Sequence, residues 1–338
     1  MSSTFIIGII YALLVLILLA SRMWISTVLG LVGILGLYFV TGSQAISMVG
    51  DLLFNTTNHF TYTMLPLFVF MGELIKYSGI SNKLYDGASQ WVKGVPGGLL
   101  HSNIASCALF SAVSGSSMAT AATIGSVAIP ELEKRKYNKR LLFGSLAGGG
   151  TLGILIPPSL GLIIYGSLVG DSIGRLFLAG LIPGILLAVL FMIYVGVRAF
   201  IQPELAPGLE KPSIKKMVLS IKDILPIILV MFAVLGTIYL GIATPTEAAA
   251  LGASLALILT IVYKKMDRFV LKNSLISAVE ISLYLMVIVI GAYILSMAFS
   301  MERIPAALAQ TIGELDVNRY VIWAILVIMY MIIGMFID

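Results

Sequence analysis

The sequence predicts an all-α polytopic membrane protein, built as an inverted repeat, with a re-entrant helical hairpin and a broken transmembrane helix. Three observations lead to this fold class: an apolar composition, two interruptions in long apolar segments, and a pattern that recurs along the chain. Of the 338 residues, 59% are hydrophobic and only 11% are charged, whereas an ordinary soluble domain carries about 25% charged residues. A chain of this composition is expected to place several apolar helices in a lipid bilayer.

The composition also argues against several other classes of protein. The net charge of +5 does not indicate nucleic-acid binding, because the basic residues lie in loops between apolar segments. The single cysteine, Cys107, lies inside an apolar run, so neither a disulfide framework nor a Cys/His zinc site is expected. The first residues lack the basic stretch of a signal peptide, so we expect a first spanning helix over 4–20.

The first interruption divides segment 98–130 into two short apolar runs. These runs, Leu99–Val113 and Met118–Ile129, hold 15 and 12 residues. At about 1.5 Å per residue, neither crosses a hydrocarbon core about 30 Å thick. Between them lies a tip rich in glycine and serine, which includes Ser111, Ser114, Gly115, Ser116 and Ser117. Two half-length helices that meet at such a tip predict a re-entrant hairpin over 98–130.

The second interruption lies in the apolar segment 141–170. It reads Gly148-Gly-Gly-Thr-Leu-Gly-Ile-Leu-Ile-Pro-Pro-Ser159. Each proline lacks a backbone donor and clashes with the preceding turn, so a helix must unwind here. Unwound backbone at membrane depth is tolerated only where it is buried in protein or lines a cavity. Two such places close together in sequence are typical of a transporter site.

The remaining segments complete a first unit over 1–200 and begin a second unit over 223–338. The first unit is expected to hold two scaffold helices, an arm, the hairpin, the broken helix and a helix over 173–200. A polar connection over 201–222 follows. Further apolar segments lie at 224–240, 245–263, 279–300 and 320–337. Shorter amphipathic pieces, expected to lie along the membrane interface, are 45–58, 81–92 and 268–278.

The Lys and Arg residues set the expected orientation. If the loop 131–140 faces the cytoplasm, alternating the segments puts 18 of the 21 Lys and Arg residues on that side. Such a bias is what the positive-inside rule describes. The hairpin is then expected to enter from the cytoplasm, the N-terminus to be periplasmic, and the connection 201–222 to be cytoplasmic.

A shift of about 220 residues places the second unit on the first. The shift pairs apolar segments of the two units: 4–20 with 224–240, 24–40 with 244–263, and 99–113 with 320–337. The number of intervening segments reverses the second copy, giving the inverted repeat that many secondary transporters use. On this offset Asp338 falls near the tip of a second hairpin, and a complete second unit would end at about residue 420. We therefore expect an incomplete second repeat, and a 338-residue chain that does not complete a transport cycle.

Five motifs occur in order along the chain. They are Met71-Gly-Glu-Leu-Ile, Pro96-Gly-Gly-Leu, Phe110-Ser-Ala-Val-Ser-Gly-Ser-Ser-Met-Ala-Thr-Ala, Gly149-Gly-Thr-Leu-Gly-Ile-Leu-Ile-Pro-Pro-Ser and Ala243-Thr-Pro-Thr-Glu-Ala-Ala-Ala. Together they resemble the large, DctM-like permease subunit of the tripartite ATP-independent periplasmic (TRAP) transporters. The resemblance covers the whole chain, and Gly334-Met-Phe-Ile-Asp338 resembles the family's entry to its second hairpin, where this sequence stops.

The resemblance implies a sodium-driven secondary transporter with an elevator-type transport domain, located in the bacterial inner membrane. It implies symport of sodium with an organic acid, such as a C4-dicarboxylate or sialic acid. It also implies two protein partners: a small membrane subunit, and a periplasmic substrate-binding protein that delivers the acid. Sodium is the implied coupling ion, and no cofactor is implied.

The tip and the opposed break have the chemistry that a sodium site requires. Sodium takes several oxygen ligands, which unwound carbonyls and serine hydroxyls supply without a formal charge. The candidate ion- and substrate-binding residues are Ser111, Ser114, Gly115, Ser116, Ser117, Gly153, Ile156, Pro157 and Pro158. The candidate Na⁺ ligands among them are Ser114, Ser117, Gly153, Ile156 and Pro158. The helix that begins near Ser116 also offers free N–H groups to a substrate carboxylate.

The alternative is that these small residues only permit close helix packing, and that the serines bond their own i−4 carbonyls. Two carboxylates near apolar segments have structural explanations as well. The sequence Thr244-Pro-Thr-Glu247 has the spacing of a capping box, so Glu247 is expected to begin a helix. Glu73 and Lys76, spaced i,i+3, are expected to pair at the membrane interface.

Other functions stay open. A stand-alone sodium- or proton-coupled carboxylate transporter would share this architecture but would need no binding protein. An intramembrane serine protease would need a Gly-x-Ser-Gly motif and a histidine on a later helix, whereas both histidines precede the serine-rich tip. The sequence contains neither a metalloprotease nor a Walker motif. We therefore expect no enzymatic activity.

Overall fold

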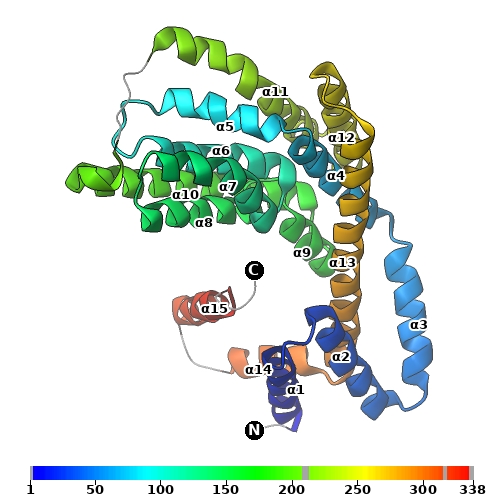
Figure 1. Ribbon diagram of the computed structural model, residues 1–338. Coiled ribbons are helices and arrows are strands. Elements are labelled where there is room, and N and C mark those ends of the chain that lie inside the picture. The colour runs from blue at the N-terminus through cyan, green and yellow to red at the C-terminus, as the bar shows by residue number, and fades with distance from the viewer. Residues whose placement is uncertain (1–2, 208–212, 315–317, 335–338) are drawn as a thin grey trace. The chain divides into compact units, whose positions relative to one another are not determined.

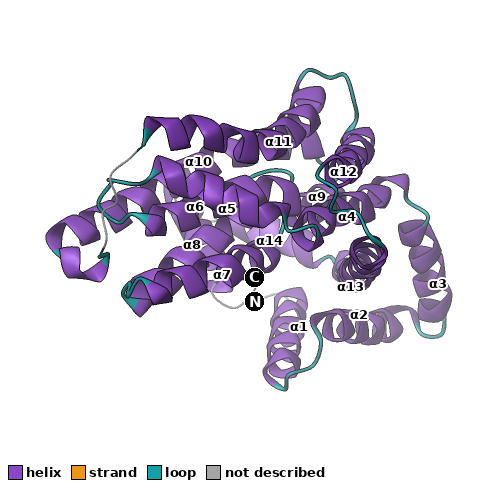
Figure 2. Cartoon of the chain, turned by 45° about the horizontal axis from the view of Figure 1, so that its top comes forward, coloured by secondary structure: helices purple, strands orange, loops and turns teal. Residues whose placement is uncertain are grey.

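All regular structure in the described part of the chain is helical. The computed structural model describes residues 3–207, 213–314 and 318–334 (Figures 1 and 2). Five helical segments within this part are long and apolar enough to cross a membrane, namely 139–169, 173–201, 214–239, 245–262 and 268–301. The chain is therefore a multi-pass membrane protein, as its composition predicts. It divides into two compact units, the first formed by 1–59 and 283–338 and the second by 60–282.

The second unit contains the hairpin and the broken helix. Its helices are η1 (Phe60–Thr63), α4 (Met64–Tyr77), α5 (Ile80–Trp91), α6 (Leu99–Ser114), α7 (Ser117–Lys134), α8 (Lys139–Leu155), α9 (Leu160–Val169), α10 (Ile173–Ile201), η2 (Pro203–Leu205), α11 (Ile214–Tyr239), α12 (Pro245–Val262) and the first part of α13 (Arg268–Met301). Figure 1 shows α6 among α5, α7, α8 and α10, with all of which it is in contact.

Helix α6 is the centre of the second unit, and its polar side chains are buried with its apolar ones. Ser102, Asn103 and Ser106 are each 0% exposed. Most buried polar groups in proteins have hydrogen-bond partners, and Asn103 has two. Its Oδ1 accepts a hydrogen bond from the Tyr85 hydroxyl (3.1 Å), and its Nδ2 donates to Ser145 Oγ (2.8 Å). This network joins α5, α6 and α8 through one side chain.

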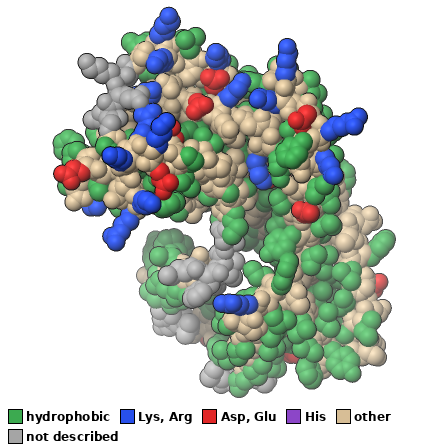
Figure 3. Space-filling view, in the orientation of Figure 1, with side chains coloured by type: hydrophobic (Ala, Val, Ile, Leu, Met, Phe, Trp, Pro, Cys, Tyr) green, Lys and Arg blue, Asp and Glu red, His purple; other side chains and the backbone are tan. Residues whose placement is uncertain are grey.

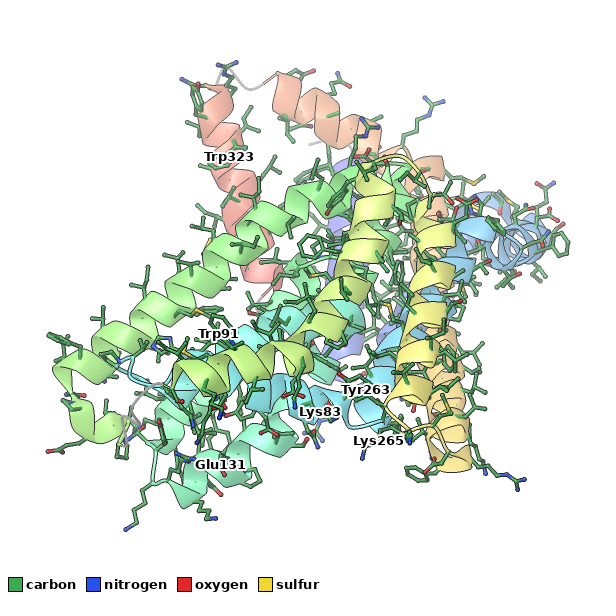
Figure 4. The ribbon with its side chains drawn as sticks, turned by 90° about the horizontal axis from the view of Figure 1, so that it is seen from above. Lys83, Trp91, Glu131, Tyr263, Lys265 and Trp323 are labelled. Carbon is green, nitrogen blue, oxygen red and sulfur yellow. The ribbon has the colours of Figure 1, made fainter. Side chains whose placement is uncertain are left out.

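Helices α4 and α5 pack against α11 and α12. A Cβ added to Gly252 would lie 2.6 Å from Met71 Sδ, so glycine is what allows α12 to approach α4 this closely. Trp91 Nε1 donates to Ser220 Oγ (3.1 Å) and joins α5 to α11. The Lys83 ammonium lies 4.2 Å from the centroid of the Tyr263 ring (Figure 4), a cation–π contact between α5 and the end of α12.

The first unit is built from α1 (Ser3–Ala20), α2 (Ile25–Thr41), α3 (Gln44–Thr57), the later part of α13, α14 (Ile304–Gly313) and α15 (Arg319–Gly334). One core cluster joins Tyr11, Val28, Val32 and Ile304. Helix α2 lies directly on α13, because a Cβ on Gly33 would stand only 2.6 Å from the backbone nitrogen of Leu295.

The structure differs from the sequence prediction at two helix boundaries. Helix α11 begins at Ile214, so the connection after α10 is shorter than the predicted 201–222. Lys215 and Lys216, taken as loop residues, are good helix formers and extend the helix. The segment 268–278 is not a separate interfacial piece, because it is the start of the continuous 34-residue helix α13. No glycine or proline lies near residue 278 to end the helix. The predicted second hairpin tip at Asp338 lies outside the described residues.

Candidate functional site

The hairpin tip is a two-residue break between α6 and α7. Gly115 has φ +62°, a left-handed conformation that glycine adopts without a steric cost, and its N–H donates to the Ser111 carbonyl (2.9 Å). Ser116 is extended and caps α7, its Oγ accepting from the Ala119 N–H at 3.4 Å. The two limbs have 16 and 18 residues, so each is about 24–27 Å long. Neither limb alone matches a hydrocarbon core about 30 Å thick.

The broken helix unwinds between Leu155 and Leu160. Ile156 has extended backbone, and Ser159 caps α9 by accepting a hydrogen bond from the Leu162 N–H (3.4 Å). Because Pro157 and Pro158 have no N–H, the carbonyls four residues earlier, those of Gly153 and Ile154, lack their usual helical donors. The break therefore leaves backbone oxygens available at the end of α8.

The two breaks lie directly against each other. The Leu160 N–H donates to the Gly115 carbonyl (3.1 Å), a backbone hydrogen bond from the broken helix to the hairpin tip. A Cβ on Gly115 would lie 2.7 Å from the Pro158 carbonyl oxygen. One on Gly153 would lie 2.6 Å from the carbonyl carbon and oxygen of Ser116. The sequence-predicted residues of the tip and of the break are thus brought together, with glycine at both points of closest approach.

Helix α4 forms a third wall beside the tip. A Cβ on Gly72 would lie 2.9 Å from Ser114 Cα, so α4 approaches the end of α6 at this glycine. Next to it, Glu73 and Lys76 form an ion pair, with Lys76 Nζ 2.8 Å from Glu73 Oε2. Their pairing confirms the i,i+3 prediction, and the place of the pair at the membrane interface stays a prediction. The Glu73 side chain is only 4% exposed, because the contact at Gly72 holds this turn of α4 against the hairpin.

A small cavity lies where α4 meets the tip. Its volume is about 30 Å³, and its lining includes Gly72, Glu73, Lys76, Ser114, Ser116 and Leu160. A volume of this size accommodates a water molecule or a small ion. The lining combines serine hydroxyls and a paired carboxylate with apolar side chains such as Phe110 and Ile281, so the cavity is mainly apolar with a few polar groups.

The serine side chains at the tip have different partners. Ser114 Oγ shares a hydrogen bond with Thr120 Oγ1 (2.7 Å). Ser117 is engaged in an interaction as well. Ser111 is 0% exposed, and its Oγ has no hydrogen-bond partner among the described residues. Ser102 and Ser106 on the same helix also lack a partner for Oγ among the described residues, and Ser111 is the one of the three that lies one helical turn before the tip.

One candidate residue, Ile156, packs against a neighbouring helix through its side chain. The Ile156 side chain points to α10, because a Cβ on Gly184 would lie 2.7 Å from Ile156 Cγ1. Any contribution of Ile156 to a ligand would therefore come from its backbone. The candidate site residues named from the sequence did not include Thr120, Gly72 or Leu160. The one available signal was Gly72 next to Glu73, a small residue beside a carboxylate in an apolar helix.

The sequence matches the family described as "Tripartite ATP-independent periplasmic transporter, DctM component" over residues 11–338. It is 33% identical over 287 residues to the C4-dicarboxylate TRAP transporter large permease protein DctM of Pseudomonas aeruginosa, covering 85% of this chain and 67% of that protein. It is 30% identical over 306 residues to the sialic acid TRAP transporter large permease protein SiaM of Vibrio cholerae, covering 90% and 71%. It is also 31% identical over 279 residues to the ectoine TRAP transporter large permease protein TeaC of Halomonas elongata, covering 81% and 64%. The chain thus spans about two thirds of the length of these relatives.

Proposed function

Because this chain belongs to the DctM component family of the tripartite ATP-independent periplasmic transporters, we propose that it serves in the large permease of a sodium-coupled importer of an organic acid. As a transporter permease, the protein is not an enzyme. The proposal adds three elements to the family assignment: the class of substrate, the coupling ion, and the inverted-repeat architecture.

The substrate class rests on what related permeases are named for. These names include C4-dicarboxylate, sialic acid and ectoine. All three molecules carry a carboxylate, so we propose a carboxylate-bearing solute for this chain. The proposed partners are those of the family: a small membrane subunit, and a periplasmic binding protein that delivers the acid at the bacterial inner membrane. At the tip, the N-terminus of α7 is the feature suited to a carboxylate.

Sodium coupling is supported by uncharged oxygen atoms on the segments that form the two breaks. The Ser111 hydroxyl is fully buried without a partner, and the carbonyls of Gly153 and Ile154 lack helical donors because of the two prolines. These oxygens are uncharged ligands of the kind that hard cations accept. The residues present therefore fit a sodium ion. Ser111 and Ser114 would supply hydroxyls, while Gly153 and Pro158 would supply carbonyls.

An inverted repeat is supported by the way the helices pair within each unit. The segment 44–77 runs from the start of α3 to the end of α4. A shift of 224 residues places its two ends on the two ends of α13, residues 268 and 301. With the same shift, α2 corresponds to α12, and α4 corresponds to the later part of α13. Helix α12 packs on α4 in one unit, and α2 packs on the later part of α13 in the other. The same pair of elements therefore forms in both units, each time with one helix from each copy.

The same exchange occurs for a second pair. Helix α11 packs on α5, and α1 packs on α14, which correspond on this offset. In both pairs, a helix from the beginning of one repeat copy packs against a later helix of the other copy. We propose that the hairpin and the broken helix move as one body during transport, which is the elevator mechanism.

The orphaned Ser111 hydroxyl carries the sodium proposal, and a pair of serine variants tests it. Thermal unfolding of the purified chain is compared in NaCl and KCl at equal ionic strength. A cation that binds only the folded state at 100 times its Kd stabilises that state by about 2.7 kcal/mol, so wild type is expected to melt at a higher temperature in NaCl. Ser111→Ala is expected to lose most of this sodium-specific increment.

Ser106→Ala is the matched control. Ser106 lies on the same helix, is also 0% exposed, and also has no hydrogen-bond partner for its Oγ among the described residues. Ser106→Ala removes the same kind of buried hydroxyl, five residues away from Ser111. This variant should therefore keep the sodium-specific increase in melting temperature. Equal melting in the two salts would contradict sodium coupling and direct the search to protons.

A further inference from the structure

We propose that the groove between α8 and α10 binds an anionic phospholipid, with its phosphate at Arg140 and Arg198 and an acyl chain along the apolar wall below them. This proposal depends on the membrane location of the chain and not on sodium coupling. It concerns a surface of the second unit separate from the junction of the two breaks.

The groove is large, and it has one polar end. Its volume is about 690 Å³, and helices α6, α8 and α10 enclose it together with Asn138 and with Leu205 of η2. Both α8 with its continuation α9 and α10 are long and apolar enough to cross a membrane. Arg140 is the second residue of α8, and Arg198 lies in the last turn of α10, so each arginine lies at an end of an apolar segment.

Neither arginine has a carboxylate partner among the described residues. Lys76, Arg135 and Arg175, by contrast, each form an ion pair with a nearby acidic side chain. The Arg198 Nη2 atom donates to the Gln202 side chain (3.3 Å), while its Nε is buried without a hydrogen-bond acceptor in the described part of the chain. Two guanidinium groups without carboxylate partners at one mouth of a groove are complementary to a phosphate.

The wall below the arginines is apolar and open. Leu190 and Tyr194 are 51% and 58% exposed, and the distance along α10 from Leu190 to Arg198 is about 12 Å. On α8, nothing lies within 4 Å of a Cβ added to Gly144, which widens the groove. The polar group of Ser145, which also lines it, is already used, because its Oγ donates to the Leu142 carbonyl and accepts from Asn103.

The groove therefore has a cationic mouth and an apolar floor, the two halves of an anionic lipid. Basic pockets between transmembrane helices are where such head groups bind. Figure 3 shows Lys and Arg side chains gathered on the surface of the second unit, with hydrophobic side chains among them. The comparable groove between α11 and α12 has a single cation, Lys222, and so is less suited to a phosphate.

The test is native mass spectrometry of the delipidated full chain with added phosphatidylglycerol or phosphatidylcholine of identical acyl chains. Phosphatidylglycerol is expected to bind more tightly to wild type. The double variant Arg140→Gln/Arg198→Gln is expected to bind phosphatidylglycerol about 10–30-fold more weakly, since each basic residue near the membrane surface contributes about 1 kcal/mol to anionic-lipid binding. Arg268→Gln, which changes an exposed arginine outside the groove, should bind as wild type does.

A second variant tests the apolar floor without changing the charge. Gly144→Leu should fold, because glycine 144 is exposed and its Cβ position is empty, and it should weaken phosphatidylglycerol binding by filling the groove. Three results would each overturn the proposal: equal binding of the two lipids, retention of phosphatidylglycerol by the double arginine variant, and displacement of phosphatidylglycerol by inorganic phosphate at millimolar concentration. The last would indicate a free-anion site.

Discussion

Replacing Gly153 by alanine is expected to separate the hairpin tip from the broken helix. The added methyl group would stand 2.6 Å from the carbonyl carbon and oxygen of Ser116 and 2.8 Å from the backbone nitrogen of Ser117. All three are backbone atoms, so no side chain can rotate away. The tip is also tied to the opposite side of the break by the hydrogen bond from the Leu160 N–H to the Gly115 carbonyl.

The magnitude follows from two opposing effects. Inserting a methyl group into a close-packed contact costs about 1–3 kcal/mol, whereas alanine in place of glycine within a helix gains about 1 kcal/mol. A net loss of up to about 2 kcal/mol in the free energy of unfolding is expected for Gly153→Ala. Gly144→Ala is the matched control on the same helix, because nothing lies within 4 Å of its added Cβ. It is expected to gain up to about 1 kcal/mol.

The assay is thermal unfolding of both variants in one detergent, followed by tryptophan fluorescence. Gly153→Ala should melt below wild type and Gly144→Ala at or above it. In NaCl, Gly153→Ala should also lose the sodium-specific increment, since the oxygens of the tip and the break no longer face each other. If the two variants melt alike, the close backbone contact between the tip and α8 is wrong.

Three further substitutions test other contacts. Asn103→Ala removes the acceptor of the buried Tyr85 hydroxyl and should destabilise by about 1–3 kcal/mol; adding Tyr85→Phe should recover part of that loss, and full additivity would contradict the network. Thr244→Ala removes the capping box of α12 and should cost about 1 kcal/mol, whereas Thr244→Ser should melt as wild type. Burial, with Asp223 and Glu131 nearby, raises the pKa of Asp86, so its charged form opposes folding and Asp86→Asn should raise the melting temperature at pH 7 in low salt. That gain should shrink as the pH falls through the raised pKa, because wild-type Asp86 then becomes neutral, and a gain independent of pH would refute the electrostatic cause.

The breaks in α6–α7 and α8–α9 are predictable from sequence because each has a local cause. Gly115 permits a left-handed residue, and Pro157 and Pro158 remove the donors that a continuous helix would need. The Thr244–Glu247 capping box has the same local character, and the structure confirms it. In each case the residues that determine the geometry are within four positions of one another.

The contacts of α4 with the tip are not predictable in this way. Gly72 meets Ser114 through packing between segments about forty residues apart, and Glu73 is buried as a consequence. Likewise, periodicity suggests a separate amphipathic helix over 268–278. A helix continues, however, until a residue ends it, and α13 continues to Met301. Whether a serine hydroxyl has a hydrogen-bond partner also depends on tertiary packing. Ser106, Ser111 and Ser114 look alike in sequence, yet only Ser114 has a neighbouring hydroxyl, that of Thr120.

The central claim is that the hairpin tip and the broken helix together bind sodium. Equilibrium binding of radiolabelled sodium to the purified chain, in excess potassium, measures this directly. Wild type and the Gly144→Ala control are expected to bind sodium that potassium does not displace, while Ser111→Ala and Gly153→Ala should bind at least about tenfold more weakly, a loss of about 1.4 kcal/mol. Sodium binding that is unchanged in both variants, or equally well competed by potassium, would contradict the claim and leave the junction as a packing contact.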